Sequence, residues 1–306
     1  MPAEHGEGSP PTRRSLVDMY GHAYLKAEEV GGRPGLAHLV YQLADGTAFS
    51  EDVAHYYAPP DHWWPTDVMA CERAVGRVLD IGCGAGRHAL AVAAAGHETV
   101  AVDPARGAVA VARRRGVDAR VGGLGSLPPG IGRFDTFLLA GGGIHLLGVL
   151  DNARKALTEL AAVARPGARI LGTCLRLREG EGDGTCVGVG VRTVGARELA
   201  SGRARYRLRV EHGAEVGEWS EWGYTADVPP ERLANIVAGT GWVVAEVTET
   251  ESVALPVFEL GHGVEECRPS AVVATDGDAH LPMATYFAVL RLDLRWRLAL
   301  PWDAPA

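Results

Sequence analysis

The chain has 306 residues, of which 47% are hydrophobic, and its formal net charge at pH 7 is −8. This length and composition suffice for a sizeable core in one large domain. The negative charge argues against a sequence-independent grip on nucleic acid, which needs a cationic surface. No uninterrupted apolar stretch is long enough to cross a bilayer, so we expect neither nucleic acid nor membrane as a partner.

Residues 1–14 are rich in glycine, proline and charge, and we predict a disordered tail there. Ser15 can cap a helix whose apolar residues recur at helical spacing. Shorter helices are expected at residues 36–43 and 66–75. Residues 15–75 are therefore interpreted as a helical N-terminal cap.

From residue 76 onward, strand patterns alternate with helix patterns, which implies right-handed βαβ units and a parallel sheet. The expected strands cover residues 76–81, 99–102, 117–121, 134–140 and 168–175. The expected helices cover residues 86–95, 106–115 and 152–164. Residues 76–175 are interpreted as a nucleotide-binding core.

After this core the pattern changes to period two. The runs VGVGVRTV and RARYRLRV, separated by glycine-rich turns, predict an antiparallel insertion at residues 176–226, serving as a lid or a dimer surface. Residues 227–306 are interpreted as the C-terminal part of the core. We expect there a helix at 230–238, strands at 242–249 and 285–292, and a long loop at 251–283.

The five cysteines are odd in number and widely spaced, without a CxxC pair. Neither a disulfide framework nor a metal site is predicted, and a reducing compartment, the cytoplasm, is expected. His55, Asp61 and His62 lie close in sequence but lack the spacing of a metal site on a helix or hairpin.

The run VLDIGCGAGRHAL, from Val78 to Leu90, predicts a buried strand, a turn with Gly82, Gly84 and Gly86, and a helix. Such a loop lets a ligand approach the backbone and the N–H groups of the helix N-terminus. The next strand ends at Asp103, where an acid can accept hydrogen bonds from ribose hydroxyls. The pattern therefore predicts a ligand that carries a nucleoside.

The glycine spacing narrows the class of ligand. A dinucleotide site needs the pattern GxGxxG, whereas this chain has GxGxG with Arg87 at the position of the last glycine, where a pyrophosphate would lie. Asp80, two residues before the first glycine, would repel a phosphate and suits an ammonium or sulfonium group. A nicotinamide oxidoreductase is therefore disfavoured.

These residues resemble motif I of the class I S-adenosylmethionine (SAM)-dependent methyltransferases, with Asp103 ending their second strand. The resemblance runs from about Val78 to Leu292. It implies an α/β fold with a doubly wound, mostly parallel seven-stranded sheet, here with an N-terminal helical cap and an antiparallel β insertion after the fifth strand. It implies SAM as cofactor, S-adenosylhomocysteine (SAH) as product and residues 76–175 as the SAM-binding core. The positions that match cofactor-binding residues of the family are Asp80, Gly82, Gly84, Gly86, Asp103, Pro104, Gly123, Leu124 and Ala140.

One position departs from the family pattern. After the third strand the family has an acid that receives the adenine amino group, followed by an apolar residue. The stretch GGLGSLP puts Gly123 and Leu124 at these two positions. Adenine would then be held by backbone groups near Leu124 or by Ser126, with weaker selection against other purines.

The fourth strand ends in FLLAGGGIHLLG, and in the family this end faces the reactive methyl group. Methyl transfer is an in-line displacement, so positioning of the acceptor does much of the work. His145 can take a proton from a phenol or a carboxylic acid acceptor, and packing against the next helix is its alternative role. The chain lacks the Asn/Asp-Pro-Pro-Tyr/Phe motif of enzymes that methylate exocyclic amines of adenine or cytosine.

Aromatic residues gather upstream of motif I, in the segment AHYYAPPDHWWP. Tyr57 and Trp64 are candidates for an apolar wall around the substrate or for a cation–π contact with the sulfonium, and an anchor for the N-terminal helices is the alternative. A later strand carries arginines on one face, which would cradle an anionic substrate or form a solvated edge. These are Arg203, Arg205, Arg207 and Arg209.

The sequence thus predicts a SAM-dependent methyltransferase that modifies an oxygen or nitrogen nucleophile, less often carbon, of a small biosynthetic metabolite. Two alternatives stay open. One is methylation of a protein or peptide side chain, with the arginine row as docking surface. The other is a catalytically idle protein with a SAM-binding fold and a structural or regulatory role. A homodimer through the insertion is also an open expectation.

Overall fold

The computed structural model describes residues 14–46, 48–175, 178–179, 193–194, 202–252 and 283–293. The predicted tail at 1–14, apart from Arg14, lies outside this part, as does most of the predicted loop at 251–283. The ends of that loop are strand residues, because β13 (Trp242–Ser252) and β14 (Met283–Leu292) extend into it. No helix within the described ranges is long and apolar enough to cross a membrane.

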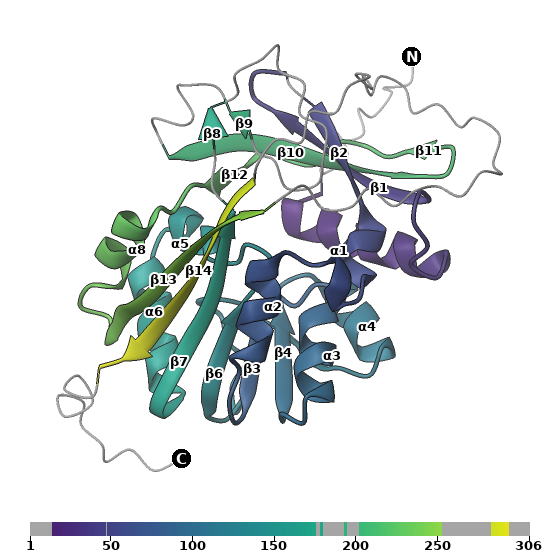
Figure 1. The fold of residues 1–306 in the computed structure, drawn as a ribbon. Helices are drawn as coiled ribbons and strands as arrows, with labels where there is room; N and C mark the ends of the chain where they lie inside the picture. Colours follow the sequence, from purple (N-terminus) through teal and green to yellow (C-terminus); the bar gives the residue numbers. More distant parts are fainter. Residues whose placement is uncertain are drawn as a thin grey trace, which may run out of the picture.

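The larger sheet has seven strands in the order β13-β14-β7-β6-β3-β4-β5 (Figure 1). Its parallel strands pair side by side, while β14 is antiparallel to both β7 and β13. This is the predicted doubly wound, mostly parallel sheet. The parallel strands are β3 (Val78–Ile81), β4 (Thr99–Asp103), β5 (Asp118–Val121), β6 (Phe134–Leu139) and β7 (Ala164–Leu175).

Helices cover both faces of this sheet, because alternate strand residues point to opposite sides. The face of Val78 and Leu138 packs against α2 (Pro65–Glu72) and α3 (Arg87–Ala94). Phe137 is fully buried on the opposite face, where such a ring contributes about 1.5–3 kcal/mol. The remaining helices of the core are α4 (Arg106–Arg114), α5 (His145–Val149), α6 (Ala153–Ala162) and α8 (Pro230–Val237).

A second, antiparallel sheet lies over the carboxyl ends of the parallel strands (Figure 1). Its order is β11-β10-β1-β2, with β12 paired to β10. It joins the N-terminal part of the chain to the predicted insertion, and we call it the cap sheet. Its strands are β1 (Ala37–Leu43), β2 (Ala48–Asp52), β10 (Arg203–His212), β11 (Glu215–Val216) and β12 (Gly223–Ala226).

The cap sheet corrects two predictions. Residues 37–43 form a strand rather than a helix, since Leu39, Tyr41 and Leu43 alternate toward a buried face that the later strand β10 completes. The cap is therefore helical only in part. In the insertion, the two-residue strands β8 (Arg178–Glu179) and β9 (Thr193–Val194) pair in parallel, not antiparallel as predicted.

Helix α1 (Leu16–Glu29) connects the cap sheet to the core, and Ser15 caps it as predicted by accepting from the Asp18 N–H. It crosses α4 where two glycines meet: a Cβ on Gly107 would lie 2.5 Å from the Gly21 oxygen. The close crossing buries one side of α1 against β10 and α4. Two 3-10 helices follow β2, η1 (Val53–Tyr57) and η2 (Pro60–His62).

Candidate active site

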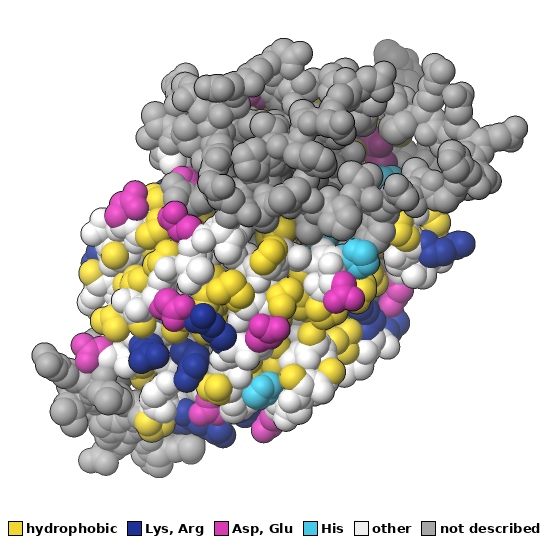
Figure 2. All heavy atoms as spheres, viewed as in Figure 1, with side chains coloured by type: hydrophobic (Ala, Val, Ile, Leu, Met, Phe, Trp, Pro, Cys, Tyr) yellow, Lys and Arg dark blue, Asp and Glu magenta, His cyan; other side chains and the backbone are white. Residues whose placement is uncertain are grey.

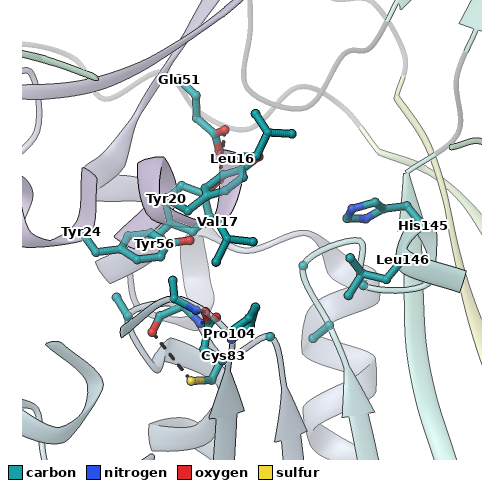
Figure 3. Close-up of a pocket in the computed structure, with 18 of the residues that line it drawn as sticks. Leu16, Val17, Tyr20, Tyr24, Glu51, Tyr56, Cys83, Pro104, His145 and Leu146 are labelled. Carbon is teal, nitrogen blue, oxygen red and sulfur yellow. Dashed lines mark hydrogen bonds between the residues drawn. The ribbon is translucent and has the colours of Figure 1, made fainter. Parts of the chain in front are cut away.

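A cavity of about 360 Å³ lies between the carboxyl ends of the parallel strands and the cap sheet (Figure 3). Its floor includes Gly82, Gly84 and Asp103, and its opposite wall includes Tyr41 and Tyr206 of the cap sheet. The cavity is therefore built from both parts of the chain, with the predicted nucleoside site at its base.

The glycine loop, residues 82–86, has three left-handed glycines that an L side chain would strain. A Cβ on Gly82 would meet nothing within 4 Å, so this position is open on the cavity side. Gly86 differs, because its Cβ would lie 2.9 Å from Val117 Cγ2 and the residue is outside the cavity lining. Gly86 thus allows the loop to pack against Val117 and α4, and Gly84 allows the close approach of Tyr24, whose hydroxyl would lie 3.0 Å from a Cβ there. Gly82 leaves open space on the cavity side.

Asp103 holds the backbone on both sides of the predicted ribose site. Its Oδ2 accepts from the Gly84 N–H at 2.9 Å, and its Oδ1 accepts from the Ala105 N–H at 2.8 Å. Burial raises the pKa of Asp103, against the effect of these two hydrogen bonds. A carboxylate has about four acceptor positions, so ribose hydroxyls fit beside both bonds.

Asp80 is the second acid near the loop and is 1% exposed. Its Oδ2 has no hydrogen-bond partner among the described residues, and the side chain lies outside the cavity lining. Burial, and then the charge of Asp103, raises the pKa of Asp80 to about 7. Two buried acids under this loop fit a cationic, phosphate-free ligand such as SAM and oppose a pyrophosphate.

We expect SAH to bind more tightly at pH 8 than at pH 6, because its ammonium group favours the ionised form of Asp80. In the free protein, the folding stability changes with pH in the opposite direction to the SAH affinity. Since the pKa rises from 3.8 to about 7, unfolding free energy falls as pH rises through that window. Calorimetry with SAH at both pH values measures the effect, and Asp80→Asn should remove most of it. A pH-independent affinity in the unmodified protein would contradict the role of Asp80.

Asp67 of α2 is fully buried and is the centre of a hydrogen-bonded network that no sequence pattern predicted. Its Oδ1 accepts from the Gly141 N–H at 2.8 Å and from Thr173 Oγ1 at 2.9 Å. Its Oδ2 lies 3.3 Å from Arg87 Nη2 and 3.5 Å from His88 Nε2. Burial alone would raise the pKa of Asp67, but the hydrogen bond from His88 and the nearby positive charge hold it well below its usual range.

This network orients the side chain of Arg87. Its Nη1 donates to the His55 oxygen at 3.0 Å, and its Nη2 faces Asp67. Arg87 therefore lines the cavity with its charge paired to a buried carboxylate.

His145 is the first residue of α5 and lines the cavity. Its Nδ1 lies 2.7 Å from the Gly142 oxygen. Because a carbonyl only accepts, Nδ1 carries a proton, and Nε2 is the basic atom of the neutral ring. His145 and Leu146 lie across the cavity from Tyr20, Tyr24 and Tyr56 (Figure 3). The imidazole of His145 therefore stands at the cavity wall.

The structure does not bring Tyr57 to the cavity, so its predicted place in the substrate wall is wrong. Its hydroxyl donates to the Tyr24 oxygen at 2.7 Å, and Arg115 stacks over its ring. Tyr56 takes that place, because the 3-10 helix η1 turns successive residues to different sides. Three further predicted residues do line the cavity: Trp64, Pro104 and Ala140.

Gly123 and Leu124 also lie outside the cavity lining. Leu124 packs into the core, and Gly123 pairs with Ser126 in a tight turn. A Cβ on Gly123 would lie 3.5 Å from Pro104 Cδ, which is an ordinary contact, and its φ is not left-handed. The turn therefore has room for the acid that the family pattern carries there.

We expect Gly123→Asp to bind SAH about tenfold more tightly, since a hydrogen bond to a charged group contributes about 1.5–3 kcal/mol. Calorimetry of the variant against the unmodified protein measures the gain. Gly123→Ala is the matched control and should leave the affinity unchanged. An equal affinity for all three would show that adenine is not held at this turn.

The arginine row of β10 is neither an open anion-binding surface nor the edge of a sheet, because other strands pair with β10 on both sides. Arg205 and Arg207 stack over the Trp222 ring, and Arg207 and Arg209 over the Trp219 ring, at 4.7–4.9 Å. The face that alternates with it is buried, as predicted. Arg205, Arg207 and Arg209 therefore serve packing within the cap sheet, while Arg203 donates to the Gly148 oxygen of α5.

Comparison with known proteins identifies the fold. A SAM-dependent methyltransferase from Bacteroides fragilis in complex with SAH has 21% sequence identity and a TM-score of 0.59, with 92% of this chain and 97% of that chain covered. The CcbJ methyltransferase from Streptomyces caelestis has 16% identity and a TM-score of 0.51, with 78% and 92% covered. A search of curated proteins gave no significant match. The fold is that of the class I SAM-dependent methyltransferases.

The family model for a methyltransferase domain matches residues 78–167. This range runs from the start of β3 into β7 and contains the glycine loop and Asp103. Residues 78–167 of the chain therefore match a methyltransferase domain, within the fold of the class I SAM-dependent methyltransferases.

Proposed function

We propose that the protein transfers the methyl group of SAM to an oxygen or nitrogen nucleophile of a small metabolite. The observation that supports this most is the cavity of about 360 Å³ between the glycine loop and the cap sheet. Its volume lies in the range of small-molecule sites, and aromatic side chains from the cap sheet, α1 and η1 line it. A biosynthetic role of the metabolite stays a prediction.

Different residues would bind the cofactor and the methyl acceptor, at the two ends of the cavity. SAM supplies a methyl group on a sulfonium sulfur. Asp103 and the backbone at Gly82 and Gly84 would hold its nucleoside and amino-acid parts. His145 would take the proton of the acceptor, and the tyrosines of the cap would exclude water.

Two observations favour a small acceptor over a macromolecule. In the arginine row, the predicted docking surface for a peptide, Arg205, Arg207 and Arg209 stack on Trp219 and Trp222, and Arg203 donates to the Gly148 oxygen. Acidic and basic side chains are interspersed over the described face of the core that Figure 2 presents, rather than forming a basic surface. Both fit the cavity as the place of the acceptor.

Methyl-labelled SAM, incubated with the protein and with either the low-molecular-mass or the protein fraction of a lysate, tests the proposal. We expect label in a low-molecular-mass product. Label in proteins alone would contradict the small acceptor, and no label in either fraction would contradict transferase activity toward these components. His145→Gln should lower the rate at least tenfold without changing the SAH affinity, since a positioned base contributes about 10²–10⁴-fold. His97→Gln, at the opposite end of the sheet, is the control.

A further inference from the structure

Trp64 carries a buried N–H donor in the cavity wall, and none of the described residues accepts from it. The residue is the N-cap of α2, lines the cavity and is 8% exposed, and its Nε1 is buried without a hydrogen-bond partner. The neighbouring Trp63 differs, because its Nε1 donates to the Ala58 oxygen at 2.8 Å and it lies outside the cavity lining. Since a buried indole N–H normally has an acceptor, the unpaired one at Trp64 indicates an acceptor atom on a ligand.

His55 of η1 supplies a second donor in the cavity lining, with its ring centroid 6.2 Å from that of Trp64. Its Nε2 lies 2.9 Å from Arg87 Nη1, and since a guanidinium only donates, Nε2 accepts and Nδ1 carries the proton. Burial, and then the charge of Arg87, lowers the pKa of His55 to about 3, so the ring is neutral at neutral pH. Within the described ranges, no atom accepts from His55 Nδ1. We call His55 and Trp64 the donor corner.

The charge beside the donor corner suits a carboxylate. Arg87 lines the cavity, whereas Asp67, with which it pairs, is fully buried and outside the lining. The positive member of this pair is therefore the one that a ligand meets. A carboxylate has two oxygens, which can accept from two N–H groups, and such charge-assisted hydrogen bonds are stronger than those between neutral groups.

We propose that the donor corner binds a carboxylate of a ligand in the cavity, through Trp64 Nε1–H and His55 Nδ1–H. The inference rests on the proposed function, because the ligand is the cofactor or the methyl acceptor of that same cavity. The amino-acid end of SAM carries one such carboxylate, and an acceptor that is a carboxylic acid carries another. The corner adjoins both places, since Arg87 follows the glycine loop and a Cβ on Gly142, in the turn before His145, would lie 4.0 Å from Trp64 Cζ3.

The first arm of the test compares SAH with decarboxylated SAH, which keeps the nucleoside and the ammonium group. Isothermal titration of the full chain gives both affinities. With the cofactor as the source of the carboxylate, SAH binds about tenfold more tightly, because only SAH forms the charge-assisted hydrogen bonds. Trp64→Phe removes the N–H but keeps an aromatic ring, and it should remove most of this preference. Trp63→Phe is the matched control and should retain the preference, because Trp63 lies outside the cavity.

The second arm compares 3-phenylpropionate with 3-phenylpropan-1-ol, two molecules of similar shape, by ligand-observed NMR on the complex of the full chain with SAH. With the methyl acceptor as the source of the carboxylate, the acid binds about tenfold more tightly than the alcohol. Trp64→Phe should again remove most of the preference, and Trp63→Phe should retain it.

The indole N–H signal of Trp64 in the assigned ¹H–¹⁵N spectrum gives a measurement that needs no variant. It should move downfield when the ligand with the carboxylate is added, and not when the matched ligand without it is added. Equal affinities within both pairs, a preference that survives Trp64→Phe, or an unmoved signal would overturn the inference. A chain that binds neither SAH nor its decarboxylated form would instead contradict the proposed function.

Discussion

Asp103→Asn is expected to weaken SAH binding about 30-fold. Hydrogen bonds to a carboxylate contribute about 1.5–3 kcal/mol each, against about 0.5–1.5 kcal/mol for neutral pairs. Two ribose hydroxyls that lose the charge of their acceptor therefore cost about 2 kcal/mol, which is about 30-fold in affinity. The amide also offers only one oxygen, so its nitrogen opposes a hydroxyl or an N–H donor.

The same substitution affects the protein without ligand, because Asp103 accepts from Gly84 and Ala105. Isothermal titration with SAH gives the affinity, and a urea melt gives the separate loss of stability. Asp118→Asn is the matched control, since Asp118 begins the next strand and is exposed. A Kd for Asp103→Asn equal to that of the unmodified protein would contradict the ribose role.

Asp67→Ala is expected to lower the free energy of unfolding by about 3–5 kcal/mol. Removal of one partner leaves the buried Arg87 charge uncompensated, which costs about that much in buried ion pairs. The Gly141 N–H and Thr173 Oγ1 lose their acceptor at the same time. Since a domain is stable by about 5–15 kcal/mol, this variant loses a large share of its stability.

Urea unfolding measures this loss, and Asp67→Asn distinguishes its parts. The amide oxygen can keep the bonds from Gly141 and Thr173, so the remaining loss reports the charge of Asp67. Glu98→Gln is the control, because it breaks an exposed pair with Arg77 and should cost less than about 1 kcal/mol. A similarly small loss in Asp67→Ala would show that the network does not stabilise the site.

The core could be predicted from sequence because its signals are local. The sequence pattern of β3, the glycine loop and the start of α3 lies within Val78–Leu90. The other strand–helix units show the same succession of a strand pattern and a helix pattern. The parallel strands are as predicted to within a few residues at their ends. The glycine loop and Asp103 come together because parallel strands end at the same edge of the sheet.

The cap could not be predicted in the same way, because its partners are distant in sequence. Gln42 and Arg207 are 165 residues apart and hydrogen-bonded across β1 and β10. Without β10, the apolar run at 37–43 fits a helix as well as a strand. The hydrogen bonds from Tyr41 and Tyr56 to Glu51 likewise form only in the folded cap. The alternation of Leu39, Tyr41 and Leu43 was the available signal for a strand.

The choice between Tyr56 and Tyr57 shows a second limit of prediction from sequence. Both are aromatic neighbours in one segment, and only the turn of η1 decides which of them faces the cavity. The Asp67 network is a third case, since its members lie on α2, α3, β7 and the turn after β6. Such contacts cannot be predicted from composition and residue spacing.

The glycine loop and Asp103 are expected to form a SAM site at the base of the cavity. Isothermal titration of the unmodified protein with SAH at pH 8 measures binding at this site. We predict one equivalent bound with a micromolar dissociation constant, together with a rise in the melting temperature. The absence of both heat and thermal shift would contradict the claim.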